Sequence, residues 1–195
     1  MTSMSQSRLT ICGLDELDVH SARSVTHVLS ILDPAWPEPV AFFAYDPHHR
    51  TTLHFHDVIE PSADIQLPRW EHVEHILAFG LAFQRDRAER DDAHLLIHCH
   101  AGISRSTAAM ASLLAQAHPE ESEERIFERL VAIRPQAWPN SLMIGYADDL
   151  LGRSGRLMAA LRRHYGRRLA LCPELAATMR GLNRAREVKM AEMPG

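Results

Sequence analysis

The sequence has few cysteines, no excess of positive charge and no long apolar run. Its three cysteines, Cys12, Cys99 and Cys172, are widely spaced in a chain of 195 residues. They form no C-x-x-C pair, so they predict neither a disulfide framework nor a structural zinc site. The net charge of −4 does not favour nucleic-acid binding, which requires a strongly basic face. The longest apolar runs are much shorter than a membrane-spanning helix.

The opening residues MTSMSQSRLTICG also lack the basic region and apolar core of a secretory signal. We therefore expect a cytoplasmic protein with reduced thiols and with neither nucleic acid nor membrane among its partners. The chain is long enough to bury a core as a single domain.

Apolar periodicity predicts the arrangement of the chain. Short β-branched or alternating runs predict strands at 8–14, 26–32, 51–58 and 94–99, with a weaker one at 40–45. The run at 94–99 is continuously apolar, as expected for a strand covered on both faces. Helical spacing predicts helices at 68–87, from 105 onward, and at 120–133, 141–151, 153–165 and 173–190. This order predicts an α/β fold with a central, mainly parallel sheet flanked by helices.

The stretch LLIHCHAGISRSTAAMA, residues 95–111, combines a strand, a short loop and the start of a helix. A helix N-terminus exposes unpaired N–H groups and carries about half a positive charge. A loop before it that contains Gly102 can turn successive N–H groups inward and form a nest for a phosphate. Arg105 adds a planar guanidinium that can bind two phosphate oxygens.

The same positive field acts on Cys99, at the end of the predicted strand. Helix N-termini and nearby cations bring cysteine pKa values down to a range of about 3.5–7.5, so we expect a reactive thiolate there. Ser106 is placed to hydrogen-bond the thiolate and ease its departure. His98 could orient the loop through its ring nitrogens. One loop would thus hold a phosphoryl group and supply its nucleophile.

The stretch HCHAGISRS matches H-C-x-x-G-x-x-R-[ST], and the chain resembles the cysteine-dependent protein tyrosine and dual-specificity phosphatases on that motif. The segment RPQAWPN, residues 134–140, resembles the R-P-x-x-x-P-N element that follows the loop in dual-specificity enzymes. There the asparagine braces the phosphate loop, and its counterpart here is Asn140, which could also be the N-cap of the next helix. The resemblance implies a catalytic domain over 1–152. Residues 153–195 match no known element and are expected to form a helical extension packed on the same domain.

The resemblance implies a phosphomonoester hydrolase that needs no metal or other cofactor and forms a phosphocysteine intermediate. Cys99 would be the nucleophile, and the loop residues His100, Ala101, Gly102, Ile103, Ser104 and Arg105 would bind the phosphoryl group. The expected partner is a phosphorylated protein or peptide, most simply one carrying phosphotyrosine, with phosphate or sulfate as a ligand of the loop. The general acid of the family stands on a loop before the signature, which indicates Asp57, with Asp64 as the alternative.

Two departures and several alternatives remain at this point. The W-P-D tripeptide of receptor-like enzymes is absent, and Asp33 stands where the family often has asparagine. A carboxylate there opposes a thiolate unless it faces away or is paired. The same loop chemistry could act on phosphoinositides or other small phosphoesters, or an inactive adaptor could only bind phosphate. A sulfur-transfer or arsenate-reducing enzyme fits the residues flanking the loop less well. The alternating histidines His54, His56, His98 and His100 have no further ligand motif to complete a metal site.

Overall fold

The computed structural model describes residues 8–90 and 92–195, so the first seven residues of the predicted domain 1–152 lie outside it. Its sheet has four parallel strands: β1 (Arg8–Cys12), β2 (His27–Leu32), β3 (His49–His54) and β4 (His94–His98), in the order β1-β4-β2-β3. The predicted α/β fold with a parallel sheet is confirmed. As predicted from its apolar run, β4 lies between two neighbours and is buried along its whole length.

The two faces of the sheet bury different clusters of side chains. Alternate residues of β4, Leu95 and Ile97, join the larger cluster beneath the long helices, whereas Leu96 between them joins a smaller one. Successive side chains of a strand point to opposite faces. The smaller cluster is covered by two 3₁₀ helices, η1 (Leu14–Arg23) and η2 (Val40–Ala44). The sheet therefore has structure on both faces, as parallel sheets require.

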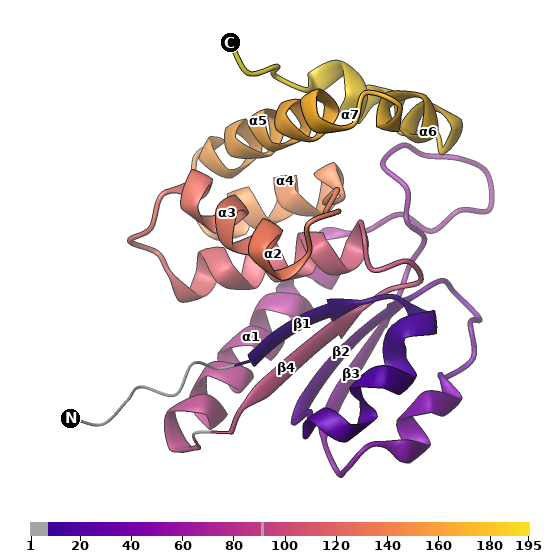
Figure 1. Ribbon diagram of the computed structural model, residues 1–195, viewed down its shortest axis with the longest axis vertical. Helices are drawn as coiled ribbons and strands as arrows, with labels where there is room; N and C mark the ends of the chain where they lie inside the picture. Colours follow the sequence, from indigo (N-terminus) through magenta and orange to yellow (C-terminus); the bar gives the residue numbers. More distant parts are fainter. Residues whose placement is uncertain (1–7, 91) are drawn as a thin grey trace.

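The α-helices form the remaining layers, which Figure 1 shows stacked to one side of the sheet. They are α1 (Trp70–Glu89), α2 (Arg105–Ala117), α3 (Glu123–Ile133), α4 (Ser141–Leu150), α5 (Arg156–Leu171), α6 (Leu175–Gly181) and α7 (Ala185–Met190). Helix α2 packs on β4 and α1, and α5 packs on α3 and α4 farther from the sheet. No helix in the described part of the chain is long and apolar enough to cross a membrane.

Two predicted elements differ from the structure. The expected strand at 40–45 is wrong, because this segment forms η2. Pro37 and Pro39 remove backbone donors that a sheet ladder would need, and Phe42 is buried while Val40 and Phe43 are exposed. The expected single helix at 173–190 is interrupted between α6 and α7, where Asn183 has a left-handed φ of 58°. A residue in that conformation ends a right-handed helix.

Candidate active site

Three residues that carry chemistry follow directly after parallel strands. Asp33 follows β2, Cys99 follows β4, and Asp57 lies three residues beyond the end of β3. The carboxyl ends of parallel strands meet at one edge of a sheet, where ligands of such folds bind. All three side chains line the same cavity, of about 530 Å³.

The loop between Cys99 and Arg105 depends on Gly102. Its φ is +67°, and a Cβ at this position would lie 2.4 Å from the carbonyl carbon of Cys12. Both the conformation and the close approach of β1 therefore require glycine. The loop is fixed against the first strand rather than projecting freely into solvent.

The backbone of this loop has its acceptors bonded and its donors free. The carbonyl of His100 accepts from Leu14 N at 2.9 Å, that of Gly102 from Arg134 Nε at 3.0 Å, and that of Ile103 from Trp138 N at 2.9 Å. None of the N–H groups of residues 100–104 donates to an acceptor among the described residues. Consecutive free N–H groups before a helix N-terminus can form an anion-binding nest, so these free donors are compatible with the predicted phosphate loop.

Arg105 begins α2 and its side chain is 3% exposed. Its Nη1 donates to Asp33 Oδ1 at 2.6 Å and to the carbonyl of Phe55 at 2.5 Å, whereas its Nε is buried without an acceptor. A buried donor without a partner costs about 1–3 kcal/mol. Asp33 is thus paired with the guanidinium. This pairing offsets the negative charge that, from the sequence, would oppose a thiolate at Cys99.

The nucleophile candidate Cys99 is 2% exposed, and its Sγ lies 3.2 Å from Ser106 Oγ. His98 is fully buried, and its Nε2 lies 2.7 Å from Ser30 Oγ on β2. Burial lowers the pKa of His98 to about 4, so the imidazole is neutral at pH 7. The imidazole of His100 instead accepts from the backbone N of Asp33 at 3.2 Å. The two histidines next to Cys99 therefore bond to β2 and to Asp33, the residue that follows it.

The carboxylate of Asp57 is held by three donors at one oxygen. Its Oδ1 accepts from Ser104 Oγ at 2.8 Å, from Asn140 Nδ2 at 3.0 Å and from Arg184 Nη2 at 2.5 Å. Its Oδ2 has no hydrogen bond to the described residues, and the side chain is 31% exposed. The alternative, Asp64, is exposed and is absent from the lining of the cavity. The structure therefore places Asp57, with one free oxygen, beside the loop.

Asn140 connects the second motif to this arrangement. Its Oδ1 accepts from the backbone N of Leu142 and Met143, so it is the N-cap of α4. Its Nδ2 meanwhile donates to Asp57, and its backbone N donates to the carbonyl of Ser104 at 3.4 Å. Both interpretations of this residue are thus compatible, because its two amide atoms have separate partners.

Three charged residues that the sequence did not single out complete the site. Arg184, just before α7, is 4% exposed and donates to Asp57 and, at 2.5 Å, to Ser104 Oγ. Glu187 on α7 is fully buried and accepts from Arg184 Nη1 at 2.9 Å. Burial lowers the pKa of Arg184, but the two carboxylates outweigh it and leave the pKa raised. No spacing in the sequence relates them to Asp57, which is 127 positions from Arg184.

Arg134 is the third of these residues, and it had a detectable signal. It opens the R-P-x-x-x-P-N element and donates to the carbonyls of Ala101 and Gly102, at 3.3 and 3.0 Å. Its guanidinium also pairs with Glu16 at 2.7 Å. By donating to these two carbonyls, Arg134 fixes the acceptor side of the loop backbone.

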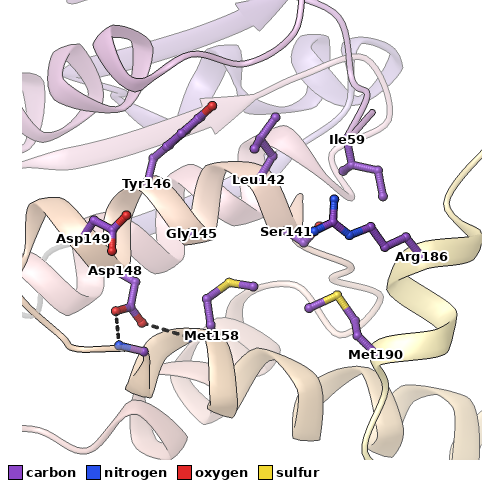
Figure 2. Close-up of a pocket in the computed structure, with 11 residues that line it drawn as sticks. Ile59, Ser141, Leu142, Gly145, Tyr146, Asp148, Asp149, Met158, Arg186 and Met190 are labelled. Atoms are coloured by element: carbon purple, nitrogen blue, oxygen red, sulfur yellow. Dashed lines mark hydrogen bonds between the residues drawn. The ribbon is translucent and has the colours of Figure 1, made fainter. Parts of the chain in front are cut away.

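A second cavity, of about 360 Å³, lies between α4, α5 and α7 and contains none of the loop residues (Figure 2). The carboxylate of Asp148 in its wall accepts from the backbone N of Gly155 and Met158, and so caps the start of α5. Asp148 therefore has a structural role.

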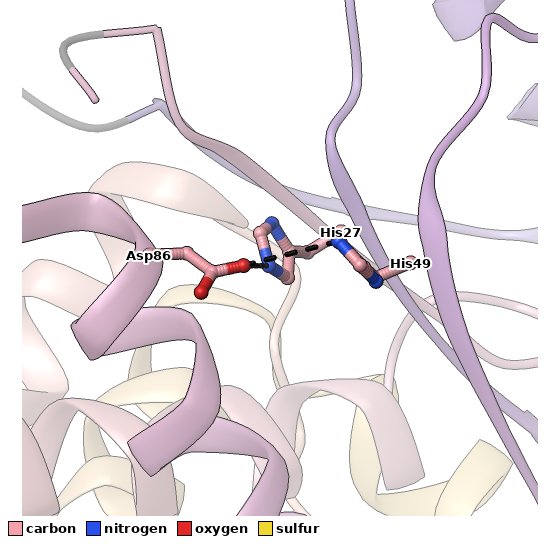
Figure 3. A group of neighbouring side chains, drawn as sticks. All are labelled: His27, His49 and Asp86. Atoms are coloured by element: carbon pink, nitrogen blue, oxygen red, sulfur yellow. Dashed lines mark hydrogen bonds and ion pairs between the residues drawn. The ribbon is translucent and has the colours of Figure 1, made fainter. Parts of the chain in front are cut away.

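The histidines that raised the question of a metal do not converge. His98 and His100 bond to β2 and its following loop, and His56 Nδ1 accepts from the backbone N of Gln66. A different group brings together His27, His49 and Asp86, with His27 Nε2 at 3.0 Å from the carboxylate (Figure 3). His27 and His49 are the first residues of β2 and β3, so this group lies at the opposite end of the sheet from Cys99.

No family model and no curated protein matches the sequence. Solved structures do match the fold. Human DUSP28 is similar with a TM-score of 0.55 and 18% identity, over 75% of this chain and 89% of that protein. DUSP15 is similar with a TM-score of 0.54 and 19% identity, over 83% and 92% of the two chains. The chain has the dual-specificity phosphatase fold.

A third match shares the same architecture. PTPMT1, solved in complex with PI(5)P, has a TM-score of 0.50 and 14% identity, over 78% of this chain and 97% of that one. At these identities the likeness establishes the fold alone. What the site of this dual-specificity phosphatase fold does has to be argued from its own residues.

Proposed function

We propose that the protein is a metal-independent phosphomonoester hydrolase that acts through a phosphocysteine intermediate on phosphotyrosine, with or without phosphoserine and phosphothreonine. The observation that supports this most is the loop itself. The N–H groups of residues 100–104 donate to no acceptor among the described residues, and Arg105, which has an unpaired buried Nε, lines the same cavity as Cys99. Such donors stabilise the charge on the equatorial oxygens of a phosphoryl group in transfer.

In the first step, the Cys99 thiolate attacks phosphorus, a sulfur–phosphorus bond forms, and the bond to the leaving oxygen breaks. Asp57 donates a proton from its Oδ2 to the leaving oxygen. Oδ2 is the carboxyl oxygen that makes no hydrogen bond with the described residues. The leaving alcohol departs neutral, and Asp57 remains as a carboxylate. Ser104, Asn140 and Arg184 hold its other oxygen in place during this change.

In the second step, the Asp57 carboxylate takes a proton from water, and the water oxygen attacks the phosphocysteine. The sulfur–phosphorus bond breaks, phosphate leaves, and the thiolate is restored with Ser106 as its hydrogen-bond partner at 3.2 Å. Atoms and charge balance without a cofactor. Asp57 ends the cycle protonated, as it began.

Hydrolysis of para-nitrophenyl phosphate tests this proposal. We expect activity that a metal chelator leaves unchanged and that the Cys99→Ser substitution lowers by at least about 10³-fold, because the serine hydroxyl is a far weaker nucleophile than a thiolate. Cys12→Ser is the matched control. Cys12 is also buried, but its side chain belongs to the cluster on the other face of the sheet.

Substantial turnover by Cys99→Ser would rule out the covalent mechanism. If the natural protein binds phosphate but hydrolyses nothing, the phosphate-binding adaptor becomes the better account.

One observation favours a second candidate, a phosphatase of phosphoinositides or other small phosphoesters. The cavity of about 530 Å³ is larger than a phosphoryl group needs, and it is lined by Arg105, Arg168 and Arg184. PTPMT1, which shares the fold, was solved with PI(5)P. The loop HAGIS has no lysine, which favours phosphotyrosine. Comparing kcat/KM for a phosphotyrosyl peptide and a soluble phosphoinositide distinguishes the two.

A further inference from the structure

The cavity above Cys99 has a wall that the catalytic steps do not use. Helix α5 contributes Arg168, and the α6 region contributes Leu175, Met179 and Leu182. This wall comes from the part of the chain beyond residue 153, to which no motif in the sequence assigns a role.

Arg168 is distinctive among the cationic side chains near the site. Its guanidinium makes no hydrogen bond or ion pair with the described residues, and its Nε is buried without an acceptor. Within the described residues only one other arginine has an orphaned buried nitrogen, and that is Arg105. Both residues line the same cavity.

The remaining arginine of the cavity is already fully engaged. Arg184 donates to Asp57, Ser104 and Glu187, so its charge is balanced inside the protein. Arg105 is the phosphoryl-binding residue of the proposed function. This leaves Arg168 as the one cation in the cavity that lacks both a role and a partner in the described part of the chain.

We propose that Arg168 binds a second anionic group of the substrate, apart from the phosphoryl group that is cleaved. The apolar side chains of Leu175, Met179 and Leu182 would cover the uncharged part of the substrate. Ligand pockets usually combine an apolar lining with a few polar groups that fix orientation. The second anion is either a carboxylate beside phosphotyrosine or a further phosphate of a small phosphoester. This inference rests on the proposed function and specifies its substrate.

The test compares substrates with one and with two anionic groups. Para-nitrophenyl phosphate has only the scissile phosphoryl group. Two phosphotyrosyl peptides differ only in having glutamate or glutamine next to the phosphotyrosine. Soluble short-chain PI(5)P has a second phosphate in its phosphodiester. The value of kcat/KM is measured for each with the natural protein, with Arg168→Gln and with Arg167→Gln, an exposed neighbour outside the cavity.

We expect Arg168→Gln to leave kcat/KM for para-nitrophenyl phosphate within about twofold. It should lower the value for one doubly anionic substrate about tenfold, which is typical for the loss of a hydrogen bond to a charged group. Loss confined to the glutamate peptide identifies a carboxylate, and loss confined to PI(5)P identifies a phosphate. Arg168→Lys should restore part of the effect, and Arg167→Gln should have none.

Equal loss on every substrate, or no selective loss on either doubly anionic one, would overturn the inference. If the natural protein hydrolyses no substrate at all, the proposed function fails separately. The subsite is then judged by binding of the same two peptides and PI(5)P to Cys99→Ser with and without Arg168→Gln. Unchanged dissociation constants would reject it.

Discussion

Side chains within residues 99–105 and within residues 168–184 line the same cavity, but the two segments are positioned in different ways. The first segment is local, because its nucleophile, nest and arginine all lie within eight consecutive residues and are positioned by one strand, one glycine and one helix start. The second acts at long range, since Arg184 meets Ser104 across 80 positions and Asp57 across 127. The comparison teaches that the candidate anion site depends on local backbone geometry, whereas Asp57, the proposed general acid, is held by tertiary contacts.

The largest effect in this comparison should come from Asp57, where the two segments meet. Asp57→Asn removes the acid but keeps an oxygen that can accept from the same three donors. We expect kcat for a phosphotyrosyl peptide to fall about 10²–10³-fold. The loss should be smaller for para-nitrophenyl phosphate, because its leaving group needs less help from a proton.

Asp64→Asn is the control for this change, because Asp64 lies in the same connection between β3 and α1 but outside the cavity. It should change kcat less than twofold. The reverse pattern, with loss only in Asp64→Asn, would move the acid to Asp64.

A smaller effect on activity is expected from Arg184→Gln, which disrupts the distant segment alone. It leaves Glu187 buried without its cationic partner, so the free energy of unfolding should fall by about 3 kcal/mol in urea titrations. The protein that remains folded should lose about tenfold in kcat as the hold on Asp57 weakens, with a changed pH profile. Phosphate binding, which depends on the local segment, should persist.

Arg186→Gln is the matched control, because Arg186 is an exposed arginine of α7, two positions after Arg184. It should change neither stability nor the pH profile. A loss of stability in Arg184→Gln without any change in kcat or its pH dependence would show that Arg184 is structural only.

The smallest effect on stability is expected from Glu16, which pairs with Arg134, the residue that donates to the loop carbonyls. The hydrogen bond from Arg134 lowers the pKa of Glu16 below its ordinary value of 4.5, although partial burial opposes this. A lowered pKa in the folded state gives stability that is present above pH 4.5 and is lost as the pH falls through the folded value. Glu16→Gln should therefore cost no more than about 1 kcal/mol at pH 7, since the carboxylate is partly exposed.

The difference between Glu16→Gln and the natural protein should shrink as the pH is lowered below 4.5, measured by urea unfolding at several pH values. Asp15→Gln serves as the control from the same helix. A difference that stays constant with pH would mean that charge pairing with Arg134 does not support the loop.

The same contrast between local sequence patterns and distant contacts explains which secondary-structure predictions were confirmed. The continuous apolar run at 94–99 predicted a central strand. A strand that is covered on both faces needs apolar side chains at successive positions, whereas a half-exposed strand alternates apolar and polar residues. The run at 40–45 has similar residues, yet it forms η2, since the prolines before it prevent pairing and only Phe42 and Tyr45 are buried. The break at Asn183 has no comparable signal in composition.

The sequence by itself determined the parallel α/β fold and the strand–loop–helix order that carries the candidate nucleophile and its arginine. These depend on consecutive residues, on a glycine that alone fits a φ of +67° beside β1, and on apolar periodicity. Only the tertiary structure decided that Asp33 pairs with Arg105, that Arg184 holds Asp57 and that Arg168 faces the cavity unpaired. Such pairings join side chains far apart in the chain, so they depend on how the helices pack and not on any local pattern.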